Sequence, residues 1–242
     1  EAFVKDFYEG INTICNKYGV LVVGGDITGG AKISISIAVI GVANGIKPAS
    51  RSYANPGDFV VATGEFGSSR AGLWLLENKA EFSSKLRNIS DEMFKKFIDS
   101  HINPIPQLET GRKIVMTCAA PAMMDASDGL ADALYKICLS SKVSMNIDYN
   151  LIPKNENLDI ICEMAKVNPF NWVMYGGEDY QLIATVSPDC YKKIIAQKIP
   201  VKKIGEICNC KKTPYHVNVF FENKSIKIDS SNIEDELFNH FG

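Results

Sequence analysis

Residues 123–134 read MMDASDGLADAL, and within this stretch the pattern of a strand gives way to the pattern of a helix. The apolar run that ends here predicts a strand over 122–126, and the residues after it predict a helix over 128–140. Strands and helices alternate in this way along most of the chain. The sequence therefore favours a mixed α/β (α+β) fold over a helix bundle or a β-sandwich.

Two blocks of predicted elements flank residues 44–58, NGIKPASRSYANPGD, whose Gly, Pro, Asn and Ser content fits a linker or crossover. The first block holds a predicted helix over 2–18 and predicted strands over 19–23 and 32–43. In the second block we expect helices over 70–79, 91–99, 107–119, 154–165 and 188–197, and strands over 59–63, 143–148, 180–187, 202–207 and 215–221. Two domains are the expected organisation.

Composition describes an ordinary globular protein of 242 residues with 46% hydrophobic and 22% charged residues. A formal charge of -2 gives no electrostatic reason to expect nucleic acid or an anionic membrane as the main partner. No apolar run is long enough to span a membrane, and no signal segment opens the chain, so a soluble protein is expected.

Seven cysteines, an odd number without CxxC spacing, favour reduced thiols and a cytoplasmic location. Cys208 and Cys210 could suggest zinc, but two thiolates without a second pair make a poor zinc site, and a strand end is the favoured interpretation. The three histidines stand apart in the sequence and form no recognisable catalytic or metal-binding motif.

Carboxylates gather where the strand of the opening stretch meets its helix. Ser127 or Asp128 could simply cap that helix, which is a common role for these residues. Capping explains one of them, but it does not explain Asp125, which follows an apolar run where an unpaired carboxylate would be costly to bury.

Two further loops combine acids with glycine: VVGGDITGG at 22–30 and YGGEDYQL at 175–182. Each alone could be a tight turn with a solvated acid. Taken together, loops at strand ends can form one site, and clustered carboxylates without histidine or paired cysteine are typical ligands of Mg²⁺. Glycine beside them would let a phosphate approach the backbone N–H groups.

A glycine-rich turn, ATGEFGSSRAGL at 62–73, leads from a predicted strand into a helix. An anion could rest against free N–H groups there, although helix capping is the slightly favoured alternative. The sequence contains no Walker A loop and no kinase-type HRD or DFG set.

In order and spacing, these motifs resemble the thiamine-monophosphate kinase family. The matching stretches are GGDITGG (24–30), SRSYANPGD (50–58), TGEFGSSRAGL (63–73), HINPIPQLETG (101–111), MDASDGLADAL (124–134) and YGGEDYQL (175–182). The resemblance implies ATP-dependent phosphorylation of thiamine monophosphate with several Mg²⁺ ions, in a cytoplasmic homodimer. It also implies the two-domain architecture of aminoimidazole ribonucleotide synthetase, with residues 1–50 as the remainder of an N-terminal ATP- and Mg-binding and dimerisation domain and 51–242 as the C-terminal α/β domain.

Site residues follow from the same resemblance, position by position. The implied metal ligands are Asp26, Asp125 and Asp128. The implied ATP-binding residues are Gly25, Asp26, Arg51 and Ser127. The implied residues for the thiamine substrate are Glu178 and Phe238. No general base is expected, because the acceptor is a phosphate.

This sequence also departs from the family pattern. Ile27 and Gly29 replace a threonine and an arginine, and Asn103 and Gln107 stand where the family has arginines. The family carries a further segment before the helix over 2–18, so we expect the N-terminal domain to be incomplete. Two alternatives stay open: another ATP-dependent enzyme of the superfamily, or a truncated non-catalytic nucleotide-binding or dimerisation module.

Overall fold

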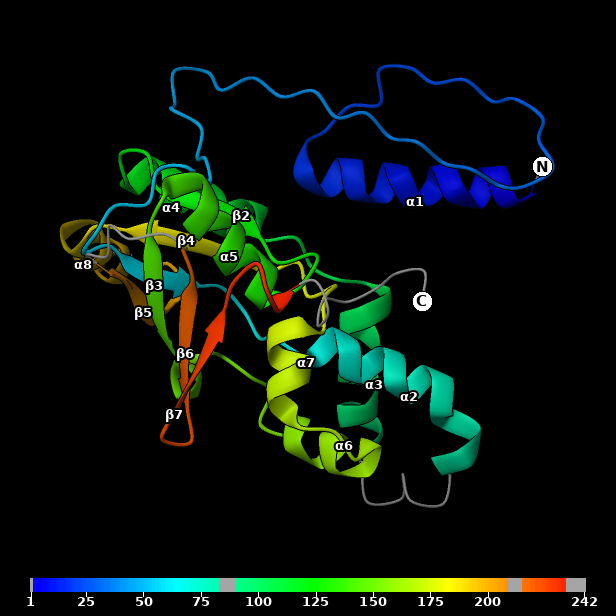
Figure 1. Ribbon diagram of the computed structural model, residues 1–242. Helices are drawn as coiled ribbons and strands as arrows, with labels where there is room; N and C mark the ends of the chain where they lie inside the picture. The colour runs from blue at the N-terminus through cyan, green and yellow to red at the C-terminus, as the bar shows by residue number, and fades with distance from the viewer. Residues whose placement is uncertain (1, 83–89, 209–214, 234–242) are drawn as a thin grey trace. The chain divides into compact units, whose positions relative to one another are not determined.

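A computed structural model describes residues 2–82, 90–208 and 215–233 (Figure 1). The chain divides into two compact units, Glu1–Val42 and Ala43–Gly242. Within the described residues, no helix is both long and apolar enough to cross a membrane.

The first unit contains the predicted N-terminal helix, α1 (Ala2–Tyr18), with the Phe3 and Phe7 rings stacked 6.4 Å apart along one side. The strands predicted over 19–23 and 32–43 are wrong for this structure, because residues 19–43 adopt neither helix nor strand. Ile33 and Ile37, for example, are 72% and 69% exposed. A strand needs a hydrogen-bonded neighbour, and the described part of this unit supplies none.

The second unit is built on one seven-stranded mixed sheet in the order β2-β4-β1-β5-β3-β6-β7. β3 runs parallel to β6, and the other paired neighbours are antiparallel. The strands are β1 (Phe59–Ala62), β2 (Ala122–Asp125), β3 (Ser144–Asp148), β4 (Leu182–Val186), β5 (Lys202–Cys208), β6 (Val217–Phe221) and β7 (Lys224–Ile228). The mixed α/β fold expected from the sequence is confirmed.

Helices cover both faces of this sheet, as the side chains of the interior strand β1 show. Val60 and Ala62 point into the larger core, whereas Val61 points into a smaller one. α4 (Leu108–Thr117) and α8 (Pro188–Ala196) contribute Ile114 and Ile194 to the smaller core. The larger core takes side chains from α2 (Ser68–Phe82), α3 (Asp91–Ile102), α5 (Leu130–Ser141), α6 (Leu158–Ala165) and α7 (Pro169–Tyr175). Figure 1 shows α2, α3, α6 and α7 grouped beside the sheet.

Besides the short 3₁₀ helix η2 (Tyr149–Leu151), two elements were not predicted from the sequence. α7 is only seven residues long, with Asn168 as its N-cap and Pro169 in its first turn, so it is too short to show helical periodicity. β7 follows β6 through Glu222 and Asn223, both with positive φ, as in the two-residue turns that suit a hairpin.

A disulfide joins Cys118, directly after α4, to Cys190 in α8, with the two Cα atoms 5.6 Å apart. The expectation that all seven cysteines are reduced is therefore wrong for this pair. These cysteines are 72 residues apart in sequence, and only the packing of α4 and α8 on the same face of the sheet brings them together. Cys15, Cys138 and Cys162 keep free thiols.

Candidate active site

The loop from β2 to α5 presents three of the predicted site residues. β2 ends at Asp125, whose side chain is exposed, and Ser127 and Asp128 lie in the turn that follows. Gly129 has a φ of 114°, and a Cβ there would lie 3.1 Å from the carbonyl oxygen of Met174. This glycine thus lets the turn pass close to α7 and fixes the direction in which α5 begins.

The loop over 175–182 lies directly against the first loop. The Glu178 N–H donates to the Ser127 carbonyl oxygen at 2.7 Å, and the Ala126 N–H donates to the Gln181 carbonyl oxygen at 2.8 Å. β2 and β4 also pair at this end, with Asp125 opposite Leu182. Four predicted site residues from two distant motifs, Asp125, Ser127, Asp128 and Glu178, are therefore neighbours in the second unit.

Tyr180 reports on the electrostatics of this cluster. Its pKa is raised to about 12, first by burial, then by the hydrogen bond of its hydroxyl to Glu178, and then by the charges of Glu178, Asp125 and Asp128. The three acids are thus close enough for their fields to act on one phenol. Nothing in the sequence marks Tyr180 as a site residue, because a tyrosine before an apolar strand is ordinary.

Asp179 serves a different purpose from its neighbour Glu178. It is buried and accepts the N–H groups of Gly67 and Ser69 at 2.8 and 3.0 Å, at the start of α2. Burial raises its pKa to about 7, and the two hydrogen bonds oppose that shift. These N–H groups of the 62–73 turn therefore already bind an internal carboxylate, which favours capping over an external anion.

Arg51 lines the same hollow as Asp125. Residues 49–51 and 123–125 line a hollow of about 340 Å³. The backbone at Arg51 is held by Ser141 at the end of α5, whose hydroxyl donates to the Arg51 carbonyl oxygen at 2.7 Å. An exposed arginine and an exposed aspartate next to one hollow could hold a phosphate and its counter-ion.

Behind Asp128, the buried Asp132 and half-buried Lys136 form an ion-pair network on α5. The Lys136 Nζ lies 2.7 Å from the Asp132 carboxylate and 3.2 Å from the Asp128 carboxylate. Burial raises the pKa of Asp132, and the hydrogen bond from Lys136 opposes that shift. The sequence pattern showed the acids but not their shared lysine.

Gly25 and Asp26 belong to the first unit. Asp26 is exposed, and its carboxylate accepts the N–H of Ile27 at 2.9 Å. A Cβ at Gly25 would lie 3.6 Å from the Tyr8 hydroxyl. Their roles stay predictions, and Phe238 lies outside the described residues.

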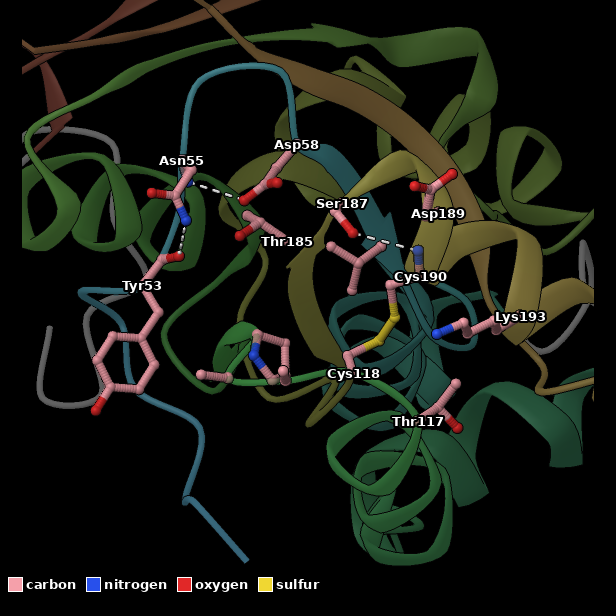
Figure 2. A pocket seen from close by; sticks show the side chains of 14 residues that line it. Tyr53, Asn55, Asp58, Thr117, Cys118, Thr185, Ser187, Asp189, Cys190 and Lys193 are labelled. Atoms are coloured by element: carbon pink, nitrogen blue, oxygen red, sulfur yellow. Dashed lines mark hydrogen bonds between the residues drawn. A yellow bond between two sulfur atoms is a disulfide. The ribbon is translucent and has the colours of Figure 1, made fainter.

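A second cavity, of about 240 Å³, lies at the opposite end of β1 and β4 (Figure 2). There Phe59 pairs with Val186, whereas Asp125 and Leu182 pair at the other end of β4. Asp58, the disulfide and Lys193 line this cavity, and the Asp58 carboxylate accepts the Asn55 N–H at 2.8 Å. It shares no lining residue with the Arg51–Asp125 hollow.

Known proteins resemble this chain along nearly its whole length. The family described as "AIR synthase related protein, N-terminal domain" matches residues 1–43. A protein of Buchnera aphidicola (subsp. Acyrthosiphon pisum) named thiamine-monophosphate kinase is 35% identical over 243 aligned residues, which cover 99% of this chain and 69% of that protein. This chain belongs to the thiamine-monophosphate kinase family.

Other members of the family agree with this assignment. The Bacillus subtilis protein of the same name is 35% identical over 86% of this chain, and the Buchnera aphidicola (subsp. Schizaphis graminum) protein is 33% identical. This chain spans 60 to 69% of the length of these three relatives.

Solved structures place this family member in the same fold. The crystal structure of thiamine monophosphate kinase from Aquifex aeolicus is 27% identical and superposes with a TM-score of 0.71, covering 94% of this chain and 70% of that one. A structure described as AaThiL complexed with AMPPCP and TMP gives the same TM-score at 26% identity, covering 93% and 68%. Escherichia coli HypE, a hydrogenase maturation protein, shares the fold at 13% identity, with a TM-score of 0.55 and coverage of 75% and 52%.

Proposed function

We propose that this kinase-family protein transfers the γ-phosphoryl group of ATP to thiamine monophosphate, forming thiamine diphosphate. The observation that carries the proposal is the 35% identity along 99% of this chain to a thiamine-monophosphate kinase. The similar structure that is described as complexed with AMPPCP, an ATP analogue, and TMP supports the same pair of substrates.

The nucleophile in this reaction is a phosphate oxygen of thiamine monophosphate, so the chain does not need to supply a general base. The second pKa of a phosphate monoester is about 6, and the attacking oxygen is largely deprotonated near pH 7. The main obstacle is repulsion between two polyanions, since even unit charges 4 Å apart interact by about 4 kcal/mol at an effective dielectric of 20. Catalysis then consists mainly of positioning and charge neutralisation.

The donor set of the second unit fits a hard cation. Asp125 and Asp128 offer carboxylate oxygens from one turn, which suit Mg²⁺ better than a soft metal. Among the described residues, no group of three acidic, histidine or cysteine side chains could hold a metal. Asp26 of the first unit is proposed as a metal ligand because the resemblance to the family implies that role. When bound, Mg²⁺ would neutralise phosphate charge.

The remaining predicted residues receive binding roles in this proposal. Gly25, Arg51 and Ser127 would hold ATP, with Arg51 acting through its fixed positive charge beside the hollow. Glu178 would hold the thiamine moiety, and Tyr180 would orient the Glu178 carboxylate through its hydroxyl. Phe238 would pack on the substrate. Residues 1–50 are assigned to an N-terminal domain and 51–242 to a C-terminal domain, in a cytoplasmic homodimer.

The test is an assay of ATP-dependent thiamine diphosphate formation, separated by chromatography, with and without Mg²⁺. Wild-type chain should form product only with ATP and the divalent cation, and Asp128→Asn should lower turnover by orders of magnitude while the circular dichroism spectrum stays unchanged. ATP binding without product in the wild type would support a non-catalytic nucleotide-binding module instead.

A further inference from the structure

Lys136 places its ammonium group between two carboxylates of very different exposure. Its Nζ lies 2.7 Å from the Asp132 carboxylate, one helical turn away on α5, and 3.2 Å from the Asp128 carboxylate in the preceding turn. One positive charge is therefore shared by two negative charges.

Burial separates the roles of the two acids. The Asp132 side chain is 5% exposed, whereas that of Asp128 is 44% exposed. A buried carboxylate that loses its partner is strongly destabilising, so Asp132 should keep Lys136 close. Asp128 is partly exposed, and an ion pair that solvent reaches contributes less and can exchange with another cation.

We propose that Lys136 is a resident cation that competes with a divalent cation for Asp128, and that Asp132 retains the ammonium group when the divalent cation binds. This inference rests on the proposed function, in which Asp128 is a metal ligand. It makes Lys136 and Asp132 positioning residues, because both act through Asp128.

Substitutions of the two residues should change metal affinity in opposite directions. Removing the ammonium group, as in Lys136→Met, removes a positive charge that lies 3.2 Å from the Asp128 carboxylate. Divalent-cation binding should then tighten about tenfold, which corresponds to about 1.4 kcal/mol, an ion-pair energy largely screened by solvent. Asp132→Asn removes the alternative partner of Lys136, so the ammonium group stays on Asp128 and binding should weaken several-fold.

The double variant Asp132→Asn/Lys136→Met decides whether Asp132 acts through Lys136. If it does, the double variant should bind as tightly as Lys136→Met alone, because without the ammonium group Asp132 has nothing to retain. If Asp132 acts only as a nearby negative charge, the effects should add and the double variant should fall between the two single variants. That second result would overturn the retaining role.

Mn²⁺ binding to the 242-residue chain is the readout, measured by the electron paramagnetic resonance signal of free Mn²⁺. Lys193→Met on α8 is the matched control, since it removes a lysine charge near the opposite end of β4 and should leave binding unchanged. Lys136→Met leaves a buried acid unpaired and could unfold the chain. In that case Asp132→Asn/Lys136→Met is compared with Asp132→Asn. This comparison measures the effect of removing the Lys136 ammonium group on Mn²⁺ affinity in a chain that no longer contains the buried Asp132 carboxylate.

Asp128→Asn separates failure of the inference from failure of the proposed function. Wild-type Mn²⁺ affinity in Asp128→Asn would overturn the assignment of Asp128 as a ligand, and the inference with it. Lost binding in Asp128→Asn together with unchanged or weaker binding in Lys136→Met would overturn only the competition by Lys136.

Discussion

Asp179→Asn should remove a large pH dependence from the free energy of unfolding. The Asp179 carboxyl is buried and accepts the N–H groups of Gly67 and Ser69 at 2.8 and 3.0 Å. Burial is the largest cause that raises its pKa to about 7, and the neighbouring charges of Glu178 and Glu65 act in the same direction. Asparagine has nearly the same volume but does not titrate in this range.

The sign and size follow from the difference between the folded and unfolded states. Because the pKa is higher in the folded state, the protonated carboxyl stabilises the fold fully below about pH 4, and this contribution is lost as the pH rises through about 7. The shift from 3.8 to about 7 covers about three pH units, and at about 1.4 kcal/mol per unit the contribution is about 4 kcal/mol.

Urea denaturation of the wild type and of Asp179→Asn between pH 4 and pH 8 measures this contribution. The wild-type free energy of unfolding should fall relative to the variant by about 4 kcal/mol across that window. Asp189→Asn is the control, because Asp189 is exposed and Lys192 lowers its pKa, so its profile should follow the wild type. Parallel curves for wild type and Asp179→Asn would refute the reasoning.

Three further predictions concern the backbone, the disulfide and the substrate. Gly129→Ala should lower the free energy of unfolding, measured by urea denaturation, by about 2 kcal/mol, because alanine is strained at this φ and its Cβ would approach the Met174 carbonyl oxygen. A decrease of less than about 0.5 kcal/mol would contradict this prediction. Cys190→Ser should cost about 2–4 kcal/mol, and reducing agent should lower wild-type stability equally; no effect of either would argue against the disulfide. Glu178→Gln should raise the KM for thiamine monophosphate at least tenfold, which is the size of one charge-assisted hydrogen bond. The KM for ATP should change little. Equal increases in the two KM values in steady-state assays would contradict the proposed role of Glu178.

Most helices and strands of the second unit can be predicted from the pattern of apolar residues within each segment. The stretch 123–134 was predicted to pass from a strand into a helix, and it does so as β2 and α5. The apolar periodicity of a helix or strand depends only on the residues of that segment, so it can be recognised without knowing which other segments pack against it. The same local pattern failed over 32–43, where alternating isoleucines predicted a strand but no partner strand is present in the described residues of that unit.

Features that depend on distant segments could not be predicted. Nothing in the sequence around Cys118 or Cys190 indicates that α4 and α8 share one face of the sheet. Likewise, the motif GGED at 176–179 suggests one turn in which Glu178 and Asp179 have similar surroundings. The structure separates them, because Asp179 is buried against the start of α2, a segment 110 residues earlier in the chain.

Each loop of the second-unit site combines an accessible acid with a buried one that has internal partners. Glu178 is partly exposed beside the buried Asp179, which two backbone N–H groups hold in place. Asp128 is partly exposed one turn before the buried Asp132, which Lys136 holds. Because the internal partners of the buried acid fix the loop, the buried acid also holds its more exposed neighbour in position. Removing a buried acid should therefore change ligand binding through its neighbour, without any direct contact with the ligand.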